Sequence, residues 1–205
     1  MANNPRGFIE SGGLHGPISP ITRTRKVKAA NALSIFPGDP VVLVSGNTVA
    51  RIPAAATAAS LPVLGVVRAI LNSNGRPLTH NLPATGNYLP ASTAGYVQVN
   101  EHPEQVYTVN TDATVVSTLI GQFVDVTALA ANSAAGISGI SIEVATGTNT
   151  AGNTVPFQVV GLSPNNLGGA AGTGQLADGF IAGEANQDVE VIIAQHTWRN
   201  PNKAR

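Results

Sequence analysis

The chain contains no cysteine among its 205 residues, which excludes disulfide bonds, thiolate nucleophiles and cysteine-ligated zinc. Charged residues make up only 11% of the sequence, whereas about 25% is usual, so few side chains are available for acid–base catalysis. No apolar run approaches the roughly 18 residues of a membrane-spanning helix, and no membrane partner is expected. The N-terminus carries Arg6 and Glu10 without an apolar stretch, so a conventional signal peptide is not expected either.

Aromatic residues are scarce as well, at 4%, whereas glycine and proline are plentiful, with 22 and 14 residues. Ala, Val, Thr, Asn and Ser account for much of the rest. This composition is typical of a β-rich protein with many turns, and it differs from a disordered chain, which would carry a high net charge. The length fits one domain, or one domain with an appendage. A chain of this size buries roughly 70% of its unfolded surface, so it needs no covalent or metal crosslinks.

Strand-like segments follow one another between residues 36 and 198. Each is a short run of alternating or β-branched residues, and clusters of Gly, Pro, Asn and Ser separate it from the next. About nine such segments are expected, at 41–45, 48–52, 63–71, 95–101, 105–109, 122–129, 139–145, 155–162 and 188–198. The segment 111–121 is the one helix candidate, with Thr111 or Asp112 as its N-cap. The pattern predicts an all-β fold with a β-sandwich or barrel-like body.

Positive charge is concentrated at the two ends of the chain. Residues 1–30 contain five basic residues and one acidic residue, for a net charge of +4. Residues 31–194 contain three basic and ten acidic residues, for −7, and residues 195–205 contribute +3. An acidic body with two basic ends indicates that the ends contact something else.

Glycine and proline interrupt every apolar run in residues 1–35, so neither a helix nor a regular strand is expected there. We therefore expect an extended basic N-terminal arm at 1–35, a β domain at 36–198 and a short C-terminal tail at 199–205. Such an arm becomes ordered only on a partner surface; the alternative is a disordered tail whose charges have no role. Nucleic acid is not expected as that partner, because the body is acidic and aromatic residues do not accompany the basic ones. The residues expected to bind the partner are Phe8, Ile9, Leu14, Ile18, Ile21, Arg23, Arg25, Lys26 and Lys28.

No pattern in the sequence points to a catalytic, metal or cofactor site. The Gly-rich stretch 168–174 is followed by no lysine and lacks the glycine spacing of a dinucleotide-binding loop. Glu101 and Glu104 flank a turn and are interpreted as solvated turn charges rather than an acid pair. The histidines lack metal-ligand spacing and are interpreted as surface or hydrogen-bonded side chains: His15, His80, His102 and His196. We therefore expect a protein that is not an enzyme and binds no cofactor.

Several motifs occur in a characteristic order from residue 36 onward. They are GDPVVL at 38–43, LGVV at 64–67, YLPASTAGYVQV at 88–99, EHPEQVYTVN at 101–110, GISGISIEV at 136–144 and VPFQVVGLSPNN at 155–166. With these motifs the chain resembles a family of small tailed-bacteriophage structural proteins, the head-decoration or minor capsid proteins. The resemblance covers about residues 36–198. It breaks at the Gly/Ala-rich stretch 168–186, which is longer here than in the family.

The resemblance implies a decoration, or cement, protein that binds the outside of an assembled shell of major capsid protein. Such a protein is made in the host cytoplasm and ends on the capsid surface of the virion. It would act as a homo-oligomer, and a trimer is expected from the local threefold positions of shell lattices, although the residues themselves do not select three. Two other functions stay open: a head–tail connector or tail component, and a secreted carbohydrate-binding module. The second needs several exposed aromatic faces, and the chain offers one Trp, three Tyr and five Phe.

Overall fold

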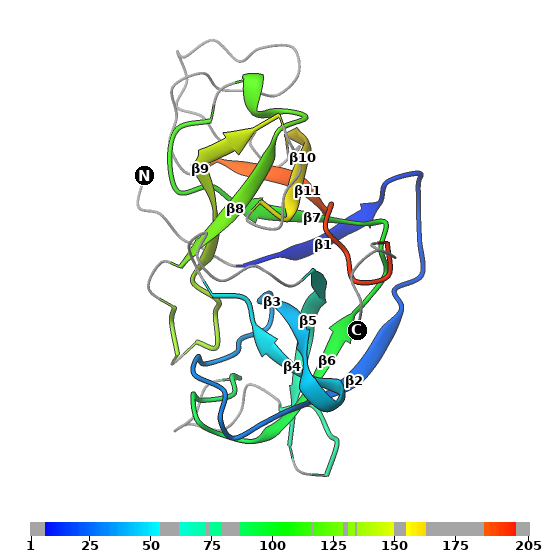
Figure 1. The fold of residues 1–205 in the computed structure, drawn as a ribbon, viewed down its shortest axis with the longest axis vertical. Helices are drawn as coiled ribbons and strands as arrows, with labels where there is room; N and C mark the ends of the chain where they lie inside the picture. Colours follow the sequence, from blue (N-terminus) through cyan, green and yellow to red (C-terminus); the bar gives the residue numbers. More distant parts are fainter. Residues whose placement is uncertain are drawn as a thin grey trace.

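In the computed structural model of this chain, the described residues are 7–53, 62–72, 74–78, 87–115, 117–128, 131–133, 135–149, 155–162 and 187–199. Eleven strands lie within these ranges and form two sheets, one above the other in Figure 1. The strands are β1 (Ile9–Gly13), β2 (Thr22–Val27), β3 (Pro40–Val44), β4 (Thr48–Arg51), β5 (Val63–Leu71), β6 (Gly95–Asn100), β7 (Gln105–Asn110), β8 (Phe123–Ala128), β9 (Ile140–Thr148), β10 (Phe157–Leu162) and β11 (Asp188–Ile193). Two short 3-10 turns accompany them, η1 (Ser45–Asn47) and η2 (Ser117–Leu119).

Five strands close into a barrel in the order β2-β4-β3-β5-β6. β3 and β4 form a hairpin whose turn needs left-handed backbone at Gly46 (φ 68°) and Asn47 (φ 58°), which glycine and asparagine adopt most readily. β2 pairs antiparallel with β6 along its whole length and parallel with β4 at Lys26 and Val27. The N-terminal segment therefore supplies the strand that closes the barrel.

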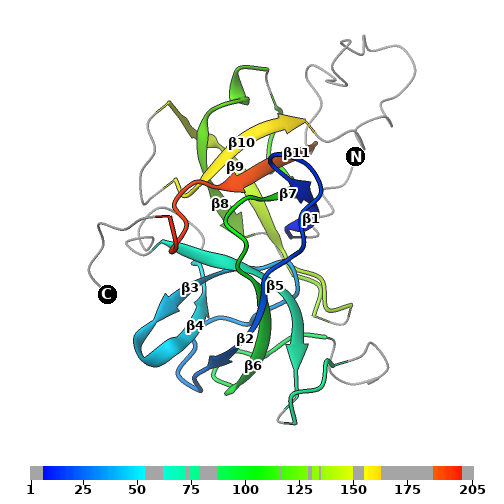
Figure 2. The same ribbon diagram turned by 90° about the vertical axis from the view of Figure 1, so that its right-hand side faces the viewer.

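The other six strands form a sheet in the order β1-β7-β11-β10-β8-β9, which occupies the upper part of Figures 1 and 2. Thr111, directly after β7, forms an isolated parallel bridge with Ile142 of β9. The carboxylate of Asp112 then accepts a hydrogen bond from the Val144 amide at 3.0 Å. These contacts join β9 to the end of β7, so the sheet curls back on itself and part of the β9 edge is covered.

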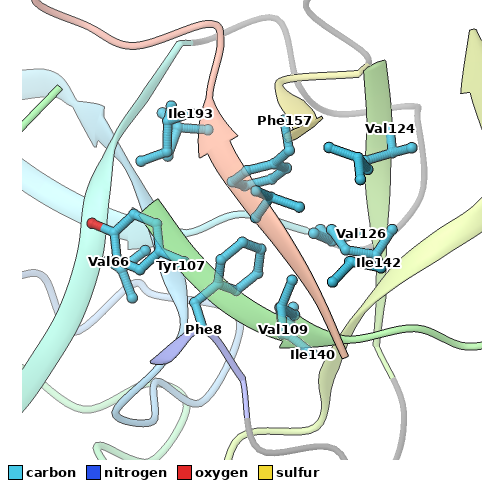
Figure 3. Close-up of a cluster of buried hydrophobic side chains, with 14 of the residues drawn as sticks. Phe8, Val66, Tyr107, Val109, Val124, Val126, Ile140, Ile142, Phe157 and Ile193 are labelled. Atoms are coloured by element: carbon cyan, nitrogen blue, oxygen red, sulfur yellow. The ribbon is translucent and has the colours of Figure 1, made fainter. Parts of the chain in front are cut away.

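The larger hydrophobic core lies between the six-stranded sheet and the outer face of the barrel (Figure 3). Side chains from both sheets meet there: Val66 of β5 lies next to Tyr107 of β7, and Phe8 lies beside them. A second, smaller core fills the barrel interior. Because the larger core takes residues from both sheets, the two lobes form one packed unit around it.

The first half of β5, from Val63 to Val67, is buried on both of its faces, whereas Arg68 is exposed. Val63 belongs to the larger core, and Leu64 belongs to the interior of the barrel. This double burial explains why the first half of the strand is apolar throughout instead of alternating. Gly65 sits where β5 comes closest to β6, and a Cβ there would lie 2.0 Å from the carbonyl oxygen of Asn100. Only glycine fits that contact.

The all-β prediction is confirmed, and the architecture combines a closed barrel with a second curved sheet. Strands occur within all nine of the segments in which they were expected. The helix expected at 111–121 is wrong apart from the single turn η2. β-Branched residues disfavour a helix in that segment, and Asp112 bonds to β9 instead of capping one.

The expected division into an arm at 1–35 and a separate β domain is wrong for the described residues. β1 pairs with β7, and β2 pairs with β6 over six residues, so the segment contributes to both sheets. The chain between these strands runs from one lobe to the other, as the blue trace shows in Figures 1 and 2. The error has a physical cause: these strands form by pairing with residues about 70 to 100 positions away, which a reading of local Gly and Pro content does not detect. Of the expected C-terminal tail, residues 200–205 lie outside the described part of the chain.

Candidate docking surface

Phe8, expected to bind a partner, is buried in the larger core instead. Its ring centroid lies 4.8 Å from that of Phe157 and 5.9 Å from that of Tyr107, the latter in an edge-on arrangement. Its backbone amide donates to the carbonyl of Gly38 at 2.9 Å. Phe8 therefore anchors the N-terminal segment to the body and cannot contact another protein.

Arg25, also expected on the partner surface, is buried in an ion pair with Glu101. Its Nε donates to Glu101 Oε1 at 2.5 Å and its Nη2 to Glu101 Oε2 at 2.7 Å. Its third nitrogen, Nη1, donates to Oδ1 of Asn47. Both charged side chains are almost fully buried, with 9% of Arg25 and 1% of Glu101 exposed. The interpretation of Glu101 as a solvated turn charge is thus wrong as well.

The position of this pair follows from strand alternation. Arg25 lies two residues from Val27, and Glu101 lies two residues from Val99, and both valines line the barrel interior. Side chains two apart on a strand share a face. The ion pair therefore occupies the inward-facing positions next to Val27 on β2 and Val99 on β6, at the edge of the apolar interior. A two-pronged, charge-assisted pair satisfies the buried groups there.

The remaining residues expected on the partner surface are exposed, but they do not form one patch. Ile9 (45% exposed) lies on β1 beside a hollow that Arg68 and Pro37 also line. Lys26 lines a different hollow on the barrel. Lys28 is exposed, whereas Ile18 is only half-exposed, in the connection between β1 and β2. Ile21 and Arg23 line one hollow together, and Leu14 lies beside the neighbouring turn at Glu104.

Ile21 and Arg23 form part of a surface that we call the junction surface, made of Leu14, Ile21, Arg23, Pro103, Glu104, Trp198 and Arg199. It gathers three segments that lie side by side at the right of Figure 1: the chain before β2, the β6–β7 turn and the chain after β11. A hollow of about 280 Å³ lies among Ile21, Arg23, Glu101, Pro103 and Trp198.

Trp198 provides the largest apolar side chain of the junction surface. Its side chain is 42% exposed, and the Arg23 guanidinium lies over its ring, 5.9 Å from the centroid. On the other side of the turn, Arg199 Nη2 lies 3.5 Å from Glu104 Oε1. The Leu14 amide donates to the Glu104 carbonyl at 3.0 Å, which holds Leu14 beside the same turn. The surface thus combines exposed apolar groups with cations at its rim.

Sequence reasoning did not assign Trp198, Pro103, Glu104 or Arg199 to this surface. The signal for Trp198 was its position, because the chain's only tryptophan stands at the end of the last expected strand segment, 188–198. The β6–β7 turn became relevant only once pairing brought the N-terminal segment beside it, as in the bond from the Glu101 amide to the Ile21 carbonyl at 2.8 Å.

His196 is a buried residue that bonds to the chain carrying Trp198 of the junction surface. It is fully buried, and its Nδ1 accepts a hydrogen bond from the Trp198 amide at 3.1 Å. Burial, assisted by the Arg199 guanidinium, lowers the pKa of His196 from its ordinary 6.5 to about 4. His196 is therefore neutral near pH 7, and its ring holds the chain after β11 in place.

Other buried ionisable groups lie within the body. Burial raises the pKa of Asp39 to about 6, against the opposing effect of Arg51. Burial likewise raises the pKa of Asp125 to about 6 and that of Tyr107 above its usual range. Ser138 donates to Asp39 Oδ1 at 2.5 Å, and the Phe36 amide donates to Oδ2 at 2.8 Å, so Asp39 serves as a structural acceptor.

Within the described ranges, no group of three or more His, Cys, Asp or Glu side chains is placed to hold a metal ion. Those ranges also contain no helix that is both long and apolar enough to span a membrane. The Gly-rich stretch 168–174 and His80, both considered in the sequence, lie outside the described residues. Two of the described hollows are lined by an ion pair, Arg68–Glu10 (3.1 Å) in one and Arg23–Glu101 (3.7 Å) in the other.

Comparisons with protein-family models, with curated proteins and with solved structures find no match to this chain. The resemblance to phage decoration proteins therefore rests on the sequence motifs, and the function has to be argued from the surface.

Proposed function

We propose that this chain is a virion structural protein that binds the outside of an assembled phage capsid shell and reinforces it. The observation that carries the proposal is the junction surface. Among the described residues, six large hydrophobic side chains are exposed, and three of them, Leu14, Ile21 and Trp198, surround the β6–β7 turn. A cluster of exposed apolar groups with a polar rim is typical of a surface that binds another protein.

The body supports this role because strand pairing holds the surface in place. The N-terminal segment, expected to bind the shell as a free arm, instead holds both lobes together. It presents Arg23 from β2, which closes the barrel, and Ile21 from the position directly before β2. A preorganised surface loses little conformational entropy on binding. On a shell of identical subunits, many copies bind at high local concentration, so each contact can be individually weak.

The test is a co-sedimentation titration with particles of the phage that encodes the chain, stripped of this protein. Replacing Ile21 and Trp198 by Ser should weaken binding at least tenfold, because two large apolar side chains leave the interface. The matched control replaces Ile9 and Ile120 by Ser; these are also exposed, at 45% and 41%, but lie away from the junction surface. If the two variants bound the particles equally well, the junction surface would not be the shell-binding surface.

A head–tail connector or tail component would use the same kind of surface. Imaging of virions distinguishes these positions directly: density for the chain distributed over the shell supports decoration, whereas density confined to the vertex that joins the tail supports a connector.

Trp198 is the observation that favours a carbohydrate-binding module, since an exposed indole is a common platform for a sugar ring. Here Arg23 already lies over the Trp198 ring, which leaves one face less open for stacking. Binding to a glycan array that is lost in Trp198→Ser, together with no binding to particles, would favour this function over decoration.

A further inference from the structure

A second hollow, which we call the barrel hollow, lies on the five-stranded barrel away from the junction surface. Its volume is about 430 Å³, within the range of pockets that hold small ligands or side chains. Most of its lining is apolar, and the main lining residues are Lys26, Leu71, Leu78, Tyr88, Pro90 and Tyr96. Tyr88 is held by stacking on Phe36, with ring centroids 4.9 Å apart and planes 9° apart. The hollow therefore has a rigid aromatic wall.

Among the described residues that line the barrel hollow, Lys26 is the single charged one. It is exposed, and no ion pair or hydrogen bond joins its side chain to the described part of the chain. Tyr96, next to it, leaves 37% of its surface exposed. An apolar hollow with one unpaired ammonium at its rim is complementary to a large apolar side chain with a carboxylate close by.

We propose that the barrel hollow binds the segment around Phe180 of a second copy of this chain. Outside the described residues, the only Asp or Glu side chains of the chain are Asp178 and Glu184, and the only Phe, Tyr or Trp is Phe180. All three occur within the sequence QLADGFIAGE at 175–184. The other undescribed segments are neutral or basic, and a basic segment would be repelled by Lys26.

The segment comes from a second copy because of where its ends lie. It connects β10 to β11, and these neighbouring strands belong to the six-stranded sheet, in the upper part of Figures 1 and 2. The barrel hollow belongs to the lower lobe. A contact between a segment of one copy and a hollow of the next is heterologous, and such contacts close into a ring when the rotation between copies permits. A ring is the arrangement expected of a trimer on a shell, but the contact itself does not depend on shell binding.

The experiment titrates a synthetic peptide of residues 174–186 into isotope-labelled full-length protein and follows the amide signals by NMR. The labelled protein carries Phe180→Ala, so that its own segment does not compete. We expect saturable shifts at Leu78, Gly95 and Tyr96. Phe180→Ala in the peptide should weaken binding about tenfold or more, because the main apolar group is lost.

Charge is tested with two matched variants on β2 and the residue that follows it. Lys26→Glu places an acid at the barrel hollow, whereas Lys28→Glu makes the same change two residues along, outside the lining. Lys26→Glu should weaken peptide binding by about fivefold or more, and Lys28→Glu should leave it nearly unchanged. Neither change touches the Tyr and Leu side chains that line the barrel hollow, so neither variant is expected to unfold the barrel.

Self-association of the unlabelled wild-type chain is measured by sedimentation velocity over a range of concentrations. Concentration-dependent oligomers that Phe180→Ala and Lys26→Glu both weaken support the proposal. Absence of saturable peptide binding at millimolar concentration, shifts centred elsewhere, or equal effects of Lys26→Glu and Lys28→Glu would overturn it. The proposal would also be overturned if the wild-type chain were monomeric at all concentrations and its amide signals at the barrel hollow already matched those of the peptide-bound state. The segment around Phe180 of the same copy would then occupy the hollow.

Discussion

Arg25 and Glu101, 76 residues apart in the chain, form a two-pronged ion pair that closes one end of the barrel. The pair joins β2 to the turn after β6, and Asn47 adds the hairpin between β3 and β4. Four strands are thereby tied at one point. The basic residues between 23 and 28 led us to expect a free arm, but one of them, Arg25, is buried in the interior of the fold.

Breaking this pair should destabilise the protein strongly. Glu101→Ala leaves the buried Arg25 without a carboxylate, and Arg25→Ala leaves the buried Glu101 with only the exposed Arg23 guanidinium, 3.7 Å away. We expect each change to cost about 3–5 kcal/mol in the free energy of unfolding. The apolar double variant Arg25→Met/Glu101→Leu should lose much less, because no buried charge remains. Urea denaturation monitored by circular dichroism measures all three. Arg23→Ala is the control, since 56% of its side chain is exposed and it should change the stability by at most about 1 kcal/mol.

The N-terminal segment should be indispensable for folding. Deletion of residues 1–27 removes β1, the barrel-closing strand β2 and Phe8, so the truncated chain should show no cooperative thermal transition. The single change Phe8→Ala should cost about 3–5 kcal/mol, whereas Ile9→Ala on the neighbouring exposed position should cost under about 1 kcal/mol. A truncated chain that melts cooperatively would show that the segment is dispensable after all.

His196 should make the protein less stable in acid. Its folded-state pKa is lowered to about 4 from 6.5, so its contribution is complete above about pH 6.5 and is lost as the pH falls toward 4. The full effect amounts to about 3 kcal/mol. Because Asp39 and Asp125 have raised pKa values, their contributions change in the opposite direction over this range.

The test therefore compares how the free energy of unfolding changes with pH in the parent protein and in variants. His196→Asn retains an acceptor near the Nδ1 position and should remove the loss of stability between pH 6.5 and 4, measured by urea titrations at each pH. His15→Asn is the control at an exposed histidine and should follow the parent curve. If the free energy of unfolding falls equally in His196→Asn and in the parent between pH 6.5 and 4, the buried histidine does not cause the loss of stability in acid.

Gly65 should tolerate no side chain. In Gly65→Ala the new Cβ would lie 2.0 Å from the Asn100 carbonyl oxygen, and β5 and β6 would have to separate where the barrel and the larger core meet. We expect a loss of about 3 kcal/mol or more, at the upper end of overpacking effects. Gly12→Ala is the matched control in β1, where a Cβ meets nothing within 4 Å. Thermal melts of the two variants provide the comparison.

Much of the fold could be predicted from the sequence because the evidence for it is local. Alternating and β-branched runs bounded by Gly, Pro and Asn placed nine strands. Of the candidate site, Leu14, Ile21 and Arg23 were found in this way, since an exposed basic and apolar segment is visible in the chain itself.

The sequence by itself therefore determined the all-β class, the positions of nine of the eleven described strands and the charge distribution, which depend on residue type and short-range order. Only the tertiary structure decided that β1 and β2 join two different sheets, that Phe8 and Arg25 are buried, and that Trp198 meets Ile21 across the β6–β7 turn. These outcomes depend on which strands pair and in which register, and pairing energy comes from cross-strand contacts between residues far apart in the chain. A basic residue such as Arg25 looks solvent-exposed until its strand is paired, because the carboxylate that makes its burial favourable, Glu101, lies 76 residues away.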